Sequence, residues 1–307
     1  MPRTPRILMA AAAVLLAGGC GGTTAAAEPD PRLAVVATTP EVADFVRAVG
    51  ADHVTVTQLI KPQVDPHDYE PTPADIRAIG TAALVVRNGV GLEEWLDRTV
   101  ESAGFRGPVV DAGQGVPLRD GGPEEGGGPD PHIWHDPANA KIMVAGIARA
   151  LTAADPGRGA AFAANLRDYS AALDQLDADN RAAFATLPAD RRKLVTNHDA
   201  FGYYVDRYGL EFVGSVIPSL DTSAELSGKQ LTDLVARIRA TGTRAVFTES
   251  SLPPRAAEAI ARQAGVKVIG GEDALYGDSL GKPGTPEGTY LGAERHNTRV
   301  IVAALAG

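Results

Sequence analysis

The chain has 307 residues, 44% of them hydrophobic, and this length suits two domains with ordinary cores better than one. Its 29 basic and 38 acidic residues give a net charge of -9 at pH 7, which argues against a nucleic-acid-binding protein. The acidic balance is typical of a soluble protein and also suits one that collects cations.

The N-terminus predicts an export signal that ends at a lipid attachment point. Two arginines precede the apolar run Ile7 to Leu16, which is too short for the roughly 20 residues of a membrane span but suits a secretory signal. The only cysteine, Cys20, ends "LLAGGC" just after this run. The segment resembles the bacterial lipobox, which implies a signal peptide over residues 1–19, cleavage before Cys20 and acylation of its thiol. An ordinary cleaved signal without a lipid is the alternative.

Residues 20–31 lack any large apolar side chain and predict a flexible tether before the folded body, which we expect to begin near Arg32. The next stretch, residues 32–154, alternates β-rich runs with amphipathic ones. The β-rich runs are "LAVVATT", "VTVTQLI" and "ALVVRNG", and the amphipathic runs are "PEVADFVRAV", "PADIRAIG" and "LEEWLDRTV". This alternation predicts βα units on a parallel sheet, and therefore a first α/β lobe.

One long helix is predicted over residues 155–188. We expect Asp155 to cap it and Pro156 to be its first residue, and Pro188 ends the pattern. The apolar residues that recur at helical spacing are Phe162, Leu166, Tyr169, Leu173 and Leu176. About 30 residues at ~1.5 Å each span roughly 45 Å, more than a crossover within one small domain needs. We therefore expect a rigid helix that joins two lobes, with an ordinary helix of one lobe as the alternative.

Residues 189–307 repeat the alternation and predict a second α/β lobe. The runs "KLVTN", "FVGSVI", "AVFTE" and "VKVIG" are typical of strands, and the segments around Val205, Leu234 and Ile260 are typical of helices. The expected fold class is therefore α/β, with two lobes built on parallel sheets and a long helix between them.

Three of the six histidines stand in settings that suit metal ligands. His67 lies in "DPHDYEP" and His132 in "DPHIWHDP", so Asp-Pro-His occurs twice in the first lobe, where proline makes the loop rigid. His198 follows the strand "KLVTN" at its C-terminal edge, where open α/β sheets collect their ligands. Neutral imidazole is the commonest transition-metal ligand, and three histidines with one carboxylate form a sensible zinc set.

Four segments, "DPHDYEPTP", "DPHIWHDP", "TNHDAFGYY" and "ALYGDSLG", resemble the ligand segments of the metal-specific (zinc or manganese) solute-binding proteins of ABC transporters. The likeness extends from about Arg32 to the C-terminus. It implies two α/β lobes joined by a single long helix, with the metal site in the cleft between the lobes. Position by position, the implied metal ligands are His67, His132, His198 and Asp278.

His135 has no counterpart in that ligand set, because the family usually carries leucine there. Asp136 and Pro137 predict that a helix begins just after His135, so His135 and His132 need not share a helix face. His135 is thus a candidate second-shell group, a transient metal contact or a plain surface residue. Glu249, which ends "AVFTE", is a candidate second-shell acceptor for a ligand imidazole.

The remaining features predict no metal ligand. His53 and His296 lie outside the four segments and are expected to be structural. Residues 119–130, rich in glycine and proline, predict a mobile surface loop. Many zinc-specific relatives carry a histidine-rich insertion before the second ligand. Residues 113–131 have no histidine, so metal scavenging by this loop is not expected.

The expected function is capture of a divalent metal ion and its delivery to the membrane permease of an ABC importer, from the outer face of the cytoplasmic membrane. Imidazole at position 198 favours zinc, because manganese relatives typically carry glutamate there; manganese is the alternative ion. A zinc-dependent hydrolase and a surface adhesin are the alternative functions. An enzyme is not expected, because a fourth protein ligand closes the zinc tetrahedron. Besides the permease, an accessory metallochaperone is a candidate partner.

Overall fold

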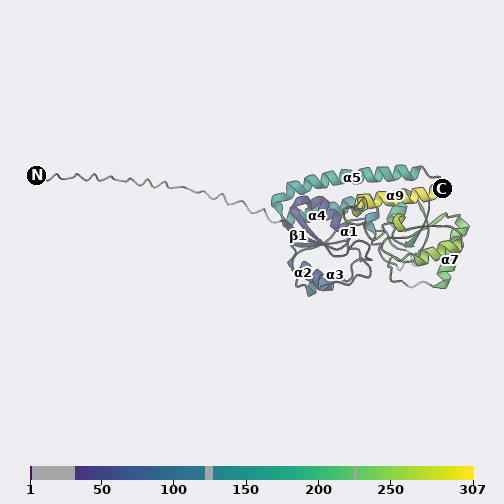
Figure 1. The fold of residues 1–307 in the computed structure, drawn as a ribbon, viewed down its shortest axis with the longest axis horizontal. Helices are drawn as coiled ribbons and strands as arrows, with labels where there is room; N and C mark the ends of the chain where they lie inside the picture. Colours follow the sequence, from purple (N-terminus) through teal and green to yellow (C-terminus); the bar gives the residue numbers. More distant parts are fainter. Residues whose placement is uncertain (2–31, 122–126, 225–226) are drawn as a thin grey trace. The chain divides into compact units, whose positions relative to one another are not determined.

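In the computed structural model of the protein, which describes Met1 and residues 32–121, 127–224 and 227–307, the first four strands form one parallel sheet. The strands are β1 (Leu33–Ala37), β2 (Val54–Gln58), β3 (Leu84–Arg87) and β4 (Val109–Asp111), in the order β2-β1-β3-β4 (Figure 1). The three-residue edge strand β4 was not predicted from the sequence. Apart from Met1, the expected signal peptide, the tether and Cys20 lie outside the described residues.

Helices cover both faces of this sheet (Figure 1). They are α1 (Pro40–Gly50), α2 (Pro73–Thr81), α3 (Leu96–Ser102) and α4 (Pro137–Ala154). Successive strand residues point to opposite faces, so Val35 and Val86 pack with α1 and α4, whereas Val36 and Val85 pack with α2 and α3. The two central strands β1 and β3 are covered on both faces and have continuous apolar runs, whereas the edge strand β2 (VTVTQ) alternates.

The two predicted helix starts have different outcomes. Asp136 accepts a hydrogen bond of 2.8 Å from a backbone N–H of the first turn, and Pro137 opens α4 as predicted. Asp155 makes no capping hydrogen bond, so that prediction was wrong. Its carboxylate lies 3.5 Å from Nε of Arg158 instead, residues 156–158 form a single 3-10 turn, and α5 begins at Gly159.

Helix α5 (Gly159–Ala185) has 27 residues, which corresponds to about 40 Å at ~1.5 Å per residue. Phe162 and Leu173 near its beginning and middle lie in the core of the first lobe, and Phe184 near its end lies in the core of the second. The prediction of a long helix that joins two lobes is therefore confirmed.

A second helix, α9 (Tyr290–Ala306), also contributes to both cores and lies beside α5 (Figure 1). Tyr290 packs in the first lobe, edge-on to Phe45 with ring centroids 4.8 Å apart. Ile301 and Leu305 pack in the second lobe. The sequence predicts this stretch only as the C-terminal end of the second lobe, so its contact with the first lobe comes from the tertiary structure.

The second lobe contains two pairs of parallel strands. Its elements are β5 (Lys193–His198), α6 (Gly202–Tyr208), β6 (Glu211–Ile217), α7 (Gly228–Thr241), β7 (Ala245–Phe247), α8 (Arg255–Ala264) and β8 (Lys267–Ile269). β5 pairs with β6 and β7 with β8, and β5 lies next to β7. Leu194 and Phe247 face α6 and α9, whereas their neighbours Val195 and Val246 face α7 and α8.

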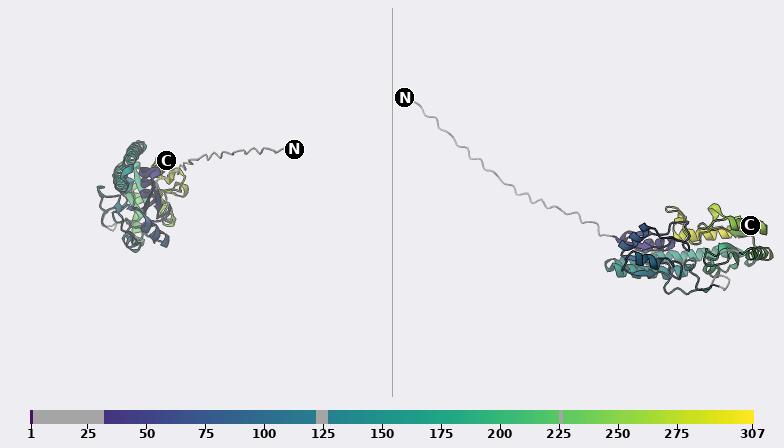
Figure 2. Two further views of the ribbon diagram at one scale, coloured as in Figure 1. Left: turned by 90° about the vertical axis from the view of Figure 1, so that its left-hand side faces the viewer. Right: turned by 90° about the horizontal axis from the view of Figure 1, so that it is seen from below.

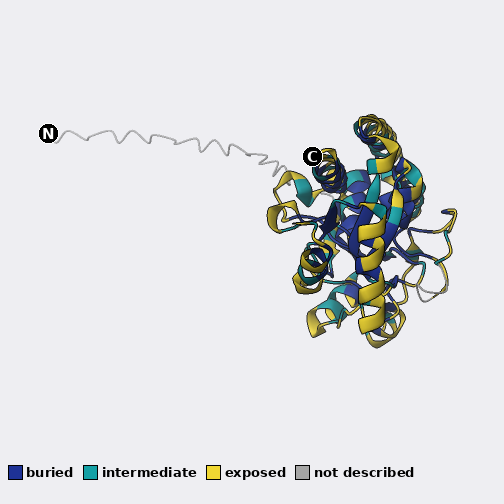
Figure 3. Ribbon diagram, turned by 90° about the vertical axis from the view of Figure 1, so that its right-hand side faces the viewer, coloured by how far each residue is buried: buried dark blue, intermediate teal, exposed yellow. Residues whose placement is uncertain are grey.

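The predicted fold class, two α/β lobes with parallel sheets and a long connecting helix, is confirmed. The right-hand view of Figure 2 shows the purple and blue segments of the first lobe and the green segments of the second at opposite ends of the body. Figure 3 shows buried strands in the middle and exposed outer helix surfaces. Residues 32–307 form one compact unit, and the expected domain boundaries within it stay predictions. No helix among the described residues is long and apolar enough to cross a membrane.

Candidate metal centre

The two Asp-Pro-His tripeptides fold into the same local turn. Asp65 Oδ1 accepts the backbone N–H of His67 at 2.9 Å, and Asp130 Oδ1 accepts that of His132 at 3.0 Å. The proline between the aspartate and the histidine restrains the backbone, so each turn fixes the backbone position of its histidine. The turn of His67 follows β2, and that of His132 precedes α4.

His198 and Asp278 come from the second lobe. His198 is the last residue of β5, and its backbone N–H donates to Glu249 Oε1 at 2.9 Å. Asp278 lies in the loop between β8 and α9. Trp134 of the first lobe holds this loop, because its Nε1–H donates to the carbonyl oxygen of Gly277 at 3.2 Å. The predicted ligands thus come from four separate segments and from both lobes.

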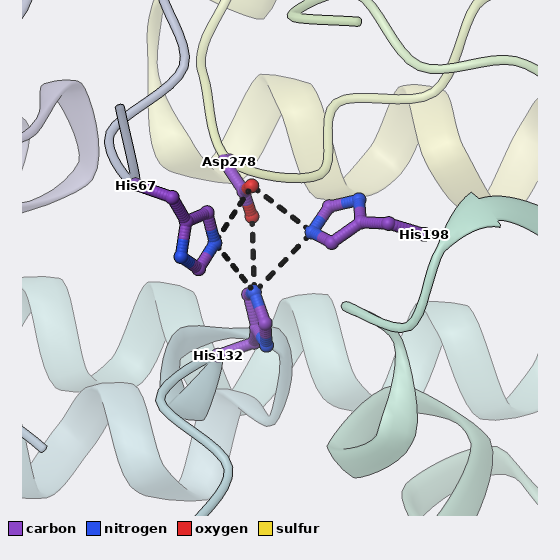
Figure 4. A group of neighbouring side chains, drawn as sticks. All are labelled: His67, His132, His198 and Asp278. Atoms are coloured by element: carbon purple, nitrogen blue, oxygen red, sulfur yellow. Dashed lines mark hydrogen bonds and ion pairs between the residues drawn. The ribbon is translucent and has the colours of Figure 1, made fainter. Parts of the chain in front are cut away.

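The four predicted ligands converge, and their donor atoms all lie within 4.8 Å of one another (Figure 4). His132 Nε2 lies 3.3 Å from both His67 Nε2 and His198 Nε2. Asp278 Oδ2 lies 3.4 Å from His67 Nε2 and 3.0 Å from His198 Nε2. Asp278 Oδ1 lies 3.4 Å from His132 Nε2. Atoms that surround an ion tetrahedrally at ~2.0–2.1 Å are about 3.3–3.4 Å apart. The donor pairs that include His132 Nε2 lie at this separation and the whole cluster spans up to 4.8 Å, so the donors surround a space of the size of a small divalent ion.

Two buried carboxylates orient the imidazoles of His132 and His198. Asp130 Oδ1 lies 2.8 Å from His132 Nδ1, and Glu249 Oε2 lies 2.8 Å from His198 Nδ1. A proton on Nδ1 that faces a carboxylate leaves the lone pair of Nε2 for a metal. Nε2 of His132 and Nε2 of His198 lie 3.3 Å apart, so at most one of them can place a hydrogen between the two rings, and a cation can take that place. The geometry of the donors is therefore that of a cation site.

The charges in the site favour a cation as well. Burial raises the pKa of Asp278, but His198 and His132 outweigh it and hold this pKa well below its usual range. Burial lowers the pKa of His198, but Asp278 and Glu249 outweigh it and hold this pKa well above its usual range. For His132, burial lowers the pKa more than Asp278 and Asp130 raise it. These opposite shifts favour a proton on His198 beside an ionised Asp278 in the metal-free protein.

The sequence places Asp130 only in the loop 119–130 and does not predict its contact with His132. The residue is fully buried, and its Oδ2 accepts a hydrogen bond of 3.2 Å from Nη1 of Arg119. The hydroxyl of Tyr203 donates to its carbonyl oxygen at 3.0 Å. These contacts hold the aspartate whose side chain orients His132. The repeated aspartate of the two Asp-Pro-His tripeptides was the available signal.

At the described ends of the segment 119–130, Asp120, Gly128 and Pro129 are exposed, and the two ends pair with each other. Gly121 N–H donates to the carbonyl of Gly128 at 2.8 Å, and Asp120 pairs with Pro129 as an antiparallel bridge. The segment is thus closed at its base, next to Asp130, by backbone hydrogen bonds. Residues 122–126 lie outside the described part of the chain.

Two further residues support the loop that carries Asp278. The side chain of Asn297 on α9 accepts the N–H of Tyr276 at 2.9 Å and donates to the carbonyl of Tyr276 at 2.8 Å. Gly277 approaches Glu249 so closely that a Cβ at this position would collide with Oε2. The absence of a side chain at Gly277 therefore allows Glu249 to reach His198.

A cavity of about 650 Å³ lies beside the site, and both lobes line it. His67 and Trp95 line it from the first lobe, and Ser219 and Asp221 from the second. The side chain of His67 is 6% exposed, whereas the side chains of the other three predicted ligands are 0% exposed. His67 is therefore the ligand at which the site meets the cavity.

His135 lies in the interior and pairs with Glu294 of α9, with Nδ1 2.8 Å from Oε1. Its ring stacks on Phe201 with ring centroids 4.5 Å apart. Burial lowers the pKa of His135, but the carboxylate of Glu294 outweighs it and raises this pKa. Because the residue is 0% exposed, a surface role is excluded, and its hydrogen bond joins α9 rather than a ligand imidazole.

The other two histidines lie apart from the four-residue cluster found in the described chain. The ring of His53 packs edge-on to Phe162 with centroids 6.1 Å apart. His296 Nε2 lies 3.0 Å from the carbonyl oxygen of Ala274, which it joins to α9. Both contacts stabilise the packing of the fold, as expected for structural histidines.

Comparison with known proteins identifies relatives across almost the whole body. The family model described as "Zinc-uptake complex component A periplasmic" (ZnuA) matches residues 35–304. Zinc-binding protein TroA of Treponema pallidum (strain Nichols) is 36% identical over 284 residues, which covers 91% of this chain and 91% of that protein. Manganese-binding lipoprotein MntA of Bacillus subtilis (strain 168) is 34% identical over 281 residues, 90% of each chain. The solved structure of the periplasmic zinc-binding protein TroA from Treponema pallidum has a TM-score of 0.83 at 34% identity, and the match covers 90% of this chain and 99% of that one.

Proposed function

Because the chain belongs to the ZnuA family of periplasmic zinc-uptake components, we propose that it captures a divalent metal ion outside the cytoplasm and delivers it to the permease of an ABC importer. The observation that carries the proposal is the convergence of three imidazoles and one carboxylate from both lobes within 4.8 Å of one another. The ion is cargo, so the site has to hold it tightly and still release it.

The contacts suggest how capture proceeds. An ion that enters beside His67 exchanges its water for the three Nε2 atoms and the carboxylate of Asp278, and the proton on His198 leaves. Since two ligands belong to each lobe, the ion links the lobes. The loaded protein is therefore more rigid across the cleft than the empty one, and this is a difference that a permease can recognise.

Zinc is the ion that the ligand set favours. Three imidazoles suit zinc, whereas manganese prefers oxygen ligands, and zinc lies above manganese in affinity for a given nitrogen and oxygen site. We expect one zinc per chain and a preference over manganese of at least about tenfold, roughly 1.4 kcal/mol. His198→Glu replaces nitrogen by oxygen and should narrow this gap. Competition titration, together with metal analysis of exported protein purified without added metal, tests the assignment; manganese bound in both experiments would overturn it.

Removal of single ligands tests the site itself. His67→Ala, His132→Ala, His198→Ala and Asp278→Ala should each weaken zinc binding strongly, because each leaves the tetrahedron with three protein ligands. The control is His53→Ala, whose ring packs on Phe162 away from the site. Isothermal titration of metal-stripped protein measures the affinities. Equal losses in the control and the ligand variants would count against the assignment.

The membrane anchor is a separate part of the proposal. Acylation of Cys20 would hold the protein at the outer face of the cytoplasmic membrane, next to the permease, and MntA is itself named a lipoprotein. Cys20→Ser should abolish labelling by a radioactive fatty acid and release the protein into the soluble fraction. Membrane attachment that survives the substitution would contradict the lipid anchor.

A zinc-dependent hydrolase is the alternative function that an activity assay can test. Hydrolytic zinc sites usually keep one position for water, whereas here a fourth protein ligand occupies it, so we expect no zinc-dependent esterase or peptidase activity. Hydrolysis that appears with zinc and disappears in His132→Ala would favour the enzyme.

Delivery by an accessory metallochaperone is tested by mixing the zinc-loaded chaperone with the metal-free protein. Transfer of zinc that is faster than the release of zinc from the chaperone alone would support direct delivery.

A further inference from the structure

The two Asp-Pro-His turns use their second carboxylate oxygen differently. In the turn of His132, Asp130 contacts the imidazole with Oδ1 and Arg119 with Oδ2, so both contacts of its carboxylate stay within its own lobe. In the turn of His67, Asp65 Oδ2 instead accepts a hydrogen bond of 2.7 Å from the hydroxyl of Thr222 in the second lobe. The turn of His67 is therefore tied across the cleft.

A second hydrogen bond ties the same loop to the second lobe. The backbone N–H of Gln63 donates to Oγ of Ser279 at 2.6 Å, next to the ligand Asp278. Gln63 has a φ of 66°, in the left-handed region that a residue with a side chain adopts only when its surroundings hold it there. We call these two hydrogen bonds, Asp65–Thr222 and Gln63–Ser279, the cross-lobe ties.

The ties act on the ligand that is held least by its own lobe. His132 and His198 each face a buried carboxylate, and Asp278 is fully buried. His67 lines the cavity and is the most exposed of the four ligands. Local opening takes place most easily where few buried contacts oppose it, so the loop of His67 is the point at which the ion can leave.

We propose that Thr222 and Ser279 are positioning residues for metal retention: acting through Asp65 and Gln63, they hold His67 on the ion and so set the rate of metal release. The inference rests on the proposed function. With the ties broken, Gln63 relaxes from its left-handed conformation and His67 moves away from the ion. A docked partner that separates residues 219–222 from the loop of His67 would thereby release the metal without disturbing the other three ligands.

Thr222→Val tests the proposal, because valine keeps the shape of threonine and removes only the hydroxyl. Zinc-loaded protein is mixed with an excess of a chromogenic chelator, and the dissociation rate is read from the zinc–chelator complex. We expect release about tenfold faster than in the unmodified protein. The association rate and the melting temperature of the metal-free protein should stay unchanged, which a general loss of structure would not allow. Thr222→Ser restores the hydroxyl and should restore slow release.

The matched control is Thr152→Val. Thr152 is also half-buried, and its hydroxyl donates to the carbonyl oxygen of Ala148 within α4, at 2.8 Å. Ser279→Ala provides an independent variant of the second tie and should also release zinc faster. If the unmodified protein bound no divalent ion, the proposed function and this inference would both fail. If it bound zinc tightly and Thr222→Val and Ser279→Ala released zinc at the unmodified rate, only this inference would fail.

Discussion

Asp130 and His132 are joined twice by a single carboxylate oxygen. Asp130 Oδ1 accepts the backbone N–H of His132 at 3.0 Å and lies 2.8 Å from Nδ1 of the same residue. One oxygen thus fixes both the turn and the orientation of the imidazole. Arg119 and Tyr203 in turn hold the aspartate, so the ring is oriented before any ion arrives.

Asp130→Asn should weaken zinc binding by about 10- to 100-fold, the usual effect of losing such a carboxylate beside a ligand histidine. The amide keeps the size of the side chain but removes the negative charge that makes the imidazole a strong donor. Titration of the metal-free variant measures the loss. The control is Asp120→Asn, an exposed residue of the same segment. An unchanged affinity for Asp130→Asn would mean that the turn alone orients His132.

Gly277→Ala should weaken zinc binding with little loss of stability. The new Cβ would collide with Oε2 of Glu249, which is the free end of a flexible side chain and can move aside. Glu249 then leaves His198, and the imidazole loses its carboxylate. Zinc affinity and melting temperature are measured together, with Gly228→Ala as the control because a Cβ at Gly228 meets nothing within 4 Å. A large drop in melting temperature with normal affinity would contradict this explanation.

His135→Ala should lower the free energy of unfolding by about 3–5 kcal/mol, because it leaves Glu294 buried without its partner. The variant should still bind one zinc, since the imidazole pairs with α9 and not with the ion. Chemical denaturation and zinc titration of the same sample separate the two effects. If the variant kept its free energy of unfolding but lost zinc binding, His135 would instead belong to the metal centre.

Zinc affinity should rise with pH by about tenfold per unit between about pH 6 and pH 8. Asp278 and Glu249 outweigh burial and hold the pKa of His198 well above its usual range, so the metal-free site keeps a proton that zinc has to displace. Fewer protons compete with zinc for His198 as the pH rises, so the zinc affinity increases. Calorimetry in two buffers of different ionisation enthalpy should detect about one proton released per zinc. In Glu249→Gln the release should be smaller, because one of the two carboxylates that retain the proton is gone.

Glu41→Gln should stabilise the metal-free protein most at alkaline pH. Burial, the largest cause, raises the pKa of Glu41 from 4.5 to about 8. Between these values the folded protein keeps a proton that the unfolded chain releases, so its stability falls as the pH rises. Glutamine does not ionise, so the variant avoids this fall. Above about pH 8 its free energy of unfolding should exceed that of the unmodified protein by up to a few kcal/mol. Denaturation at pH 5 and pH 8 measures the difference, with exposed Glu101→Gln as the control.

Local patterns determined the parts of this protein that depend on a few neighbouring residues. The βα alternation predicted both lobes because a buried parallel strand needs a continuous apolar run and a helix needs an apolar stripe. The long helix followed from apolar residues spaced between two prolines, although its first turn was misplaced because Asp155 pairs with Arg158 instead of capping. The repeated Asp-Pro-His predicted two of the ligand loops, because its rigid turn depends only on neighbouring residues.

Contacts between distant segments required the tertiary structure. Glu249 reaches His198 because Gly277 has no side chain in its way, and this close approach has no sequence pattern of its own. The pairing of His135 with Glu294 spans 159 residues, and that of Asp65 with Thr222 spans 157. The chain by itself therefore determined which side chains could bind a metal. Only the packing of the two lobes decided which of them meet and how each is held, because a hydrogen bond over such a separation exists only once the intervening chain has folded.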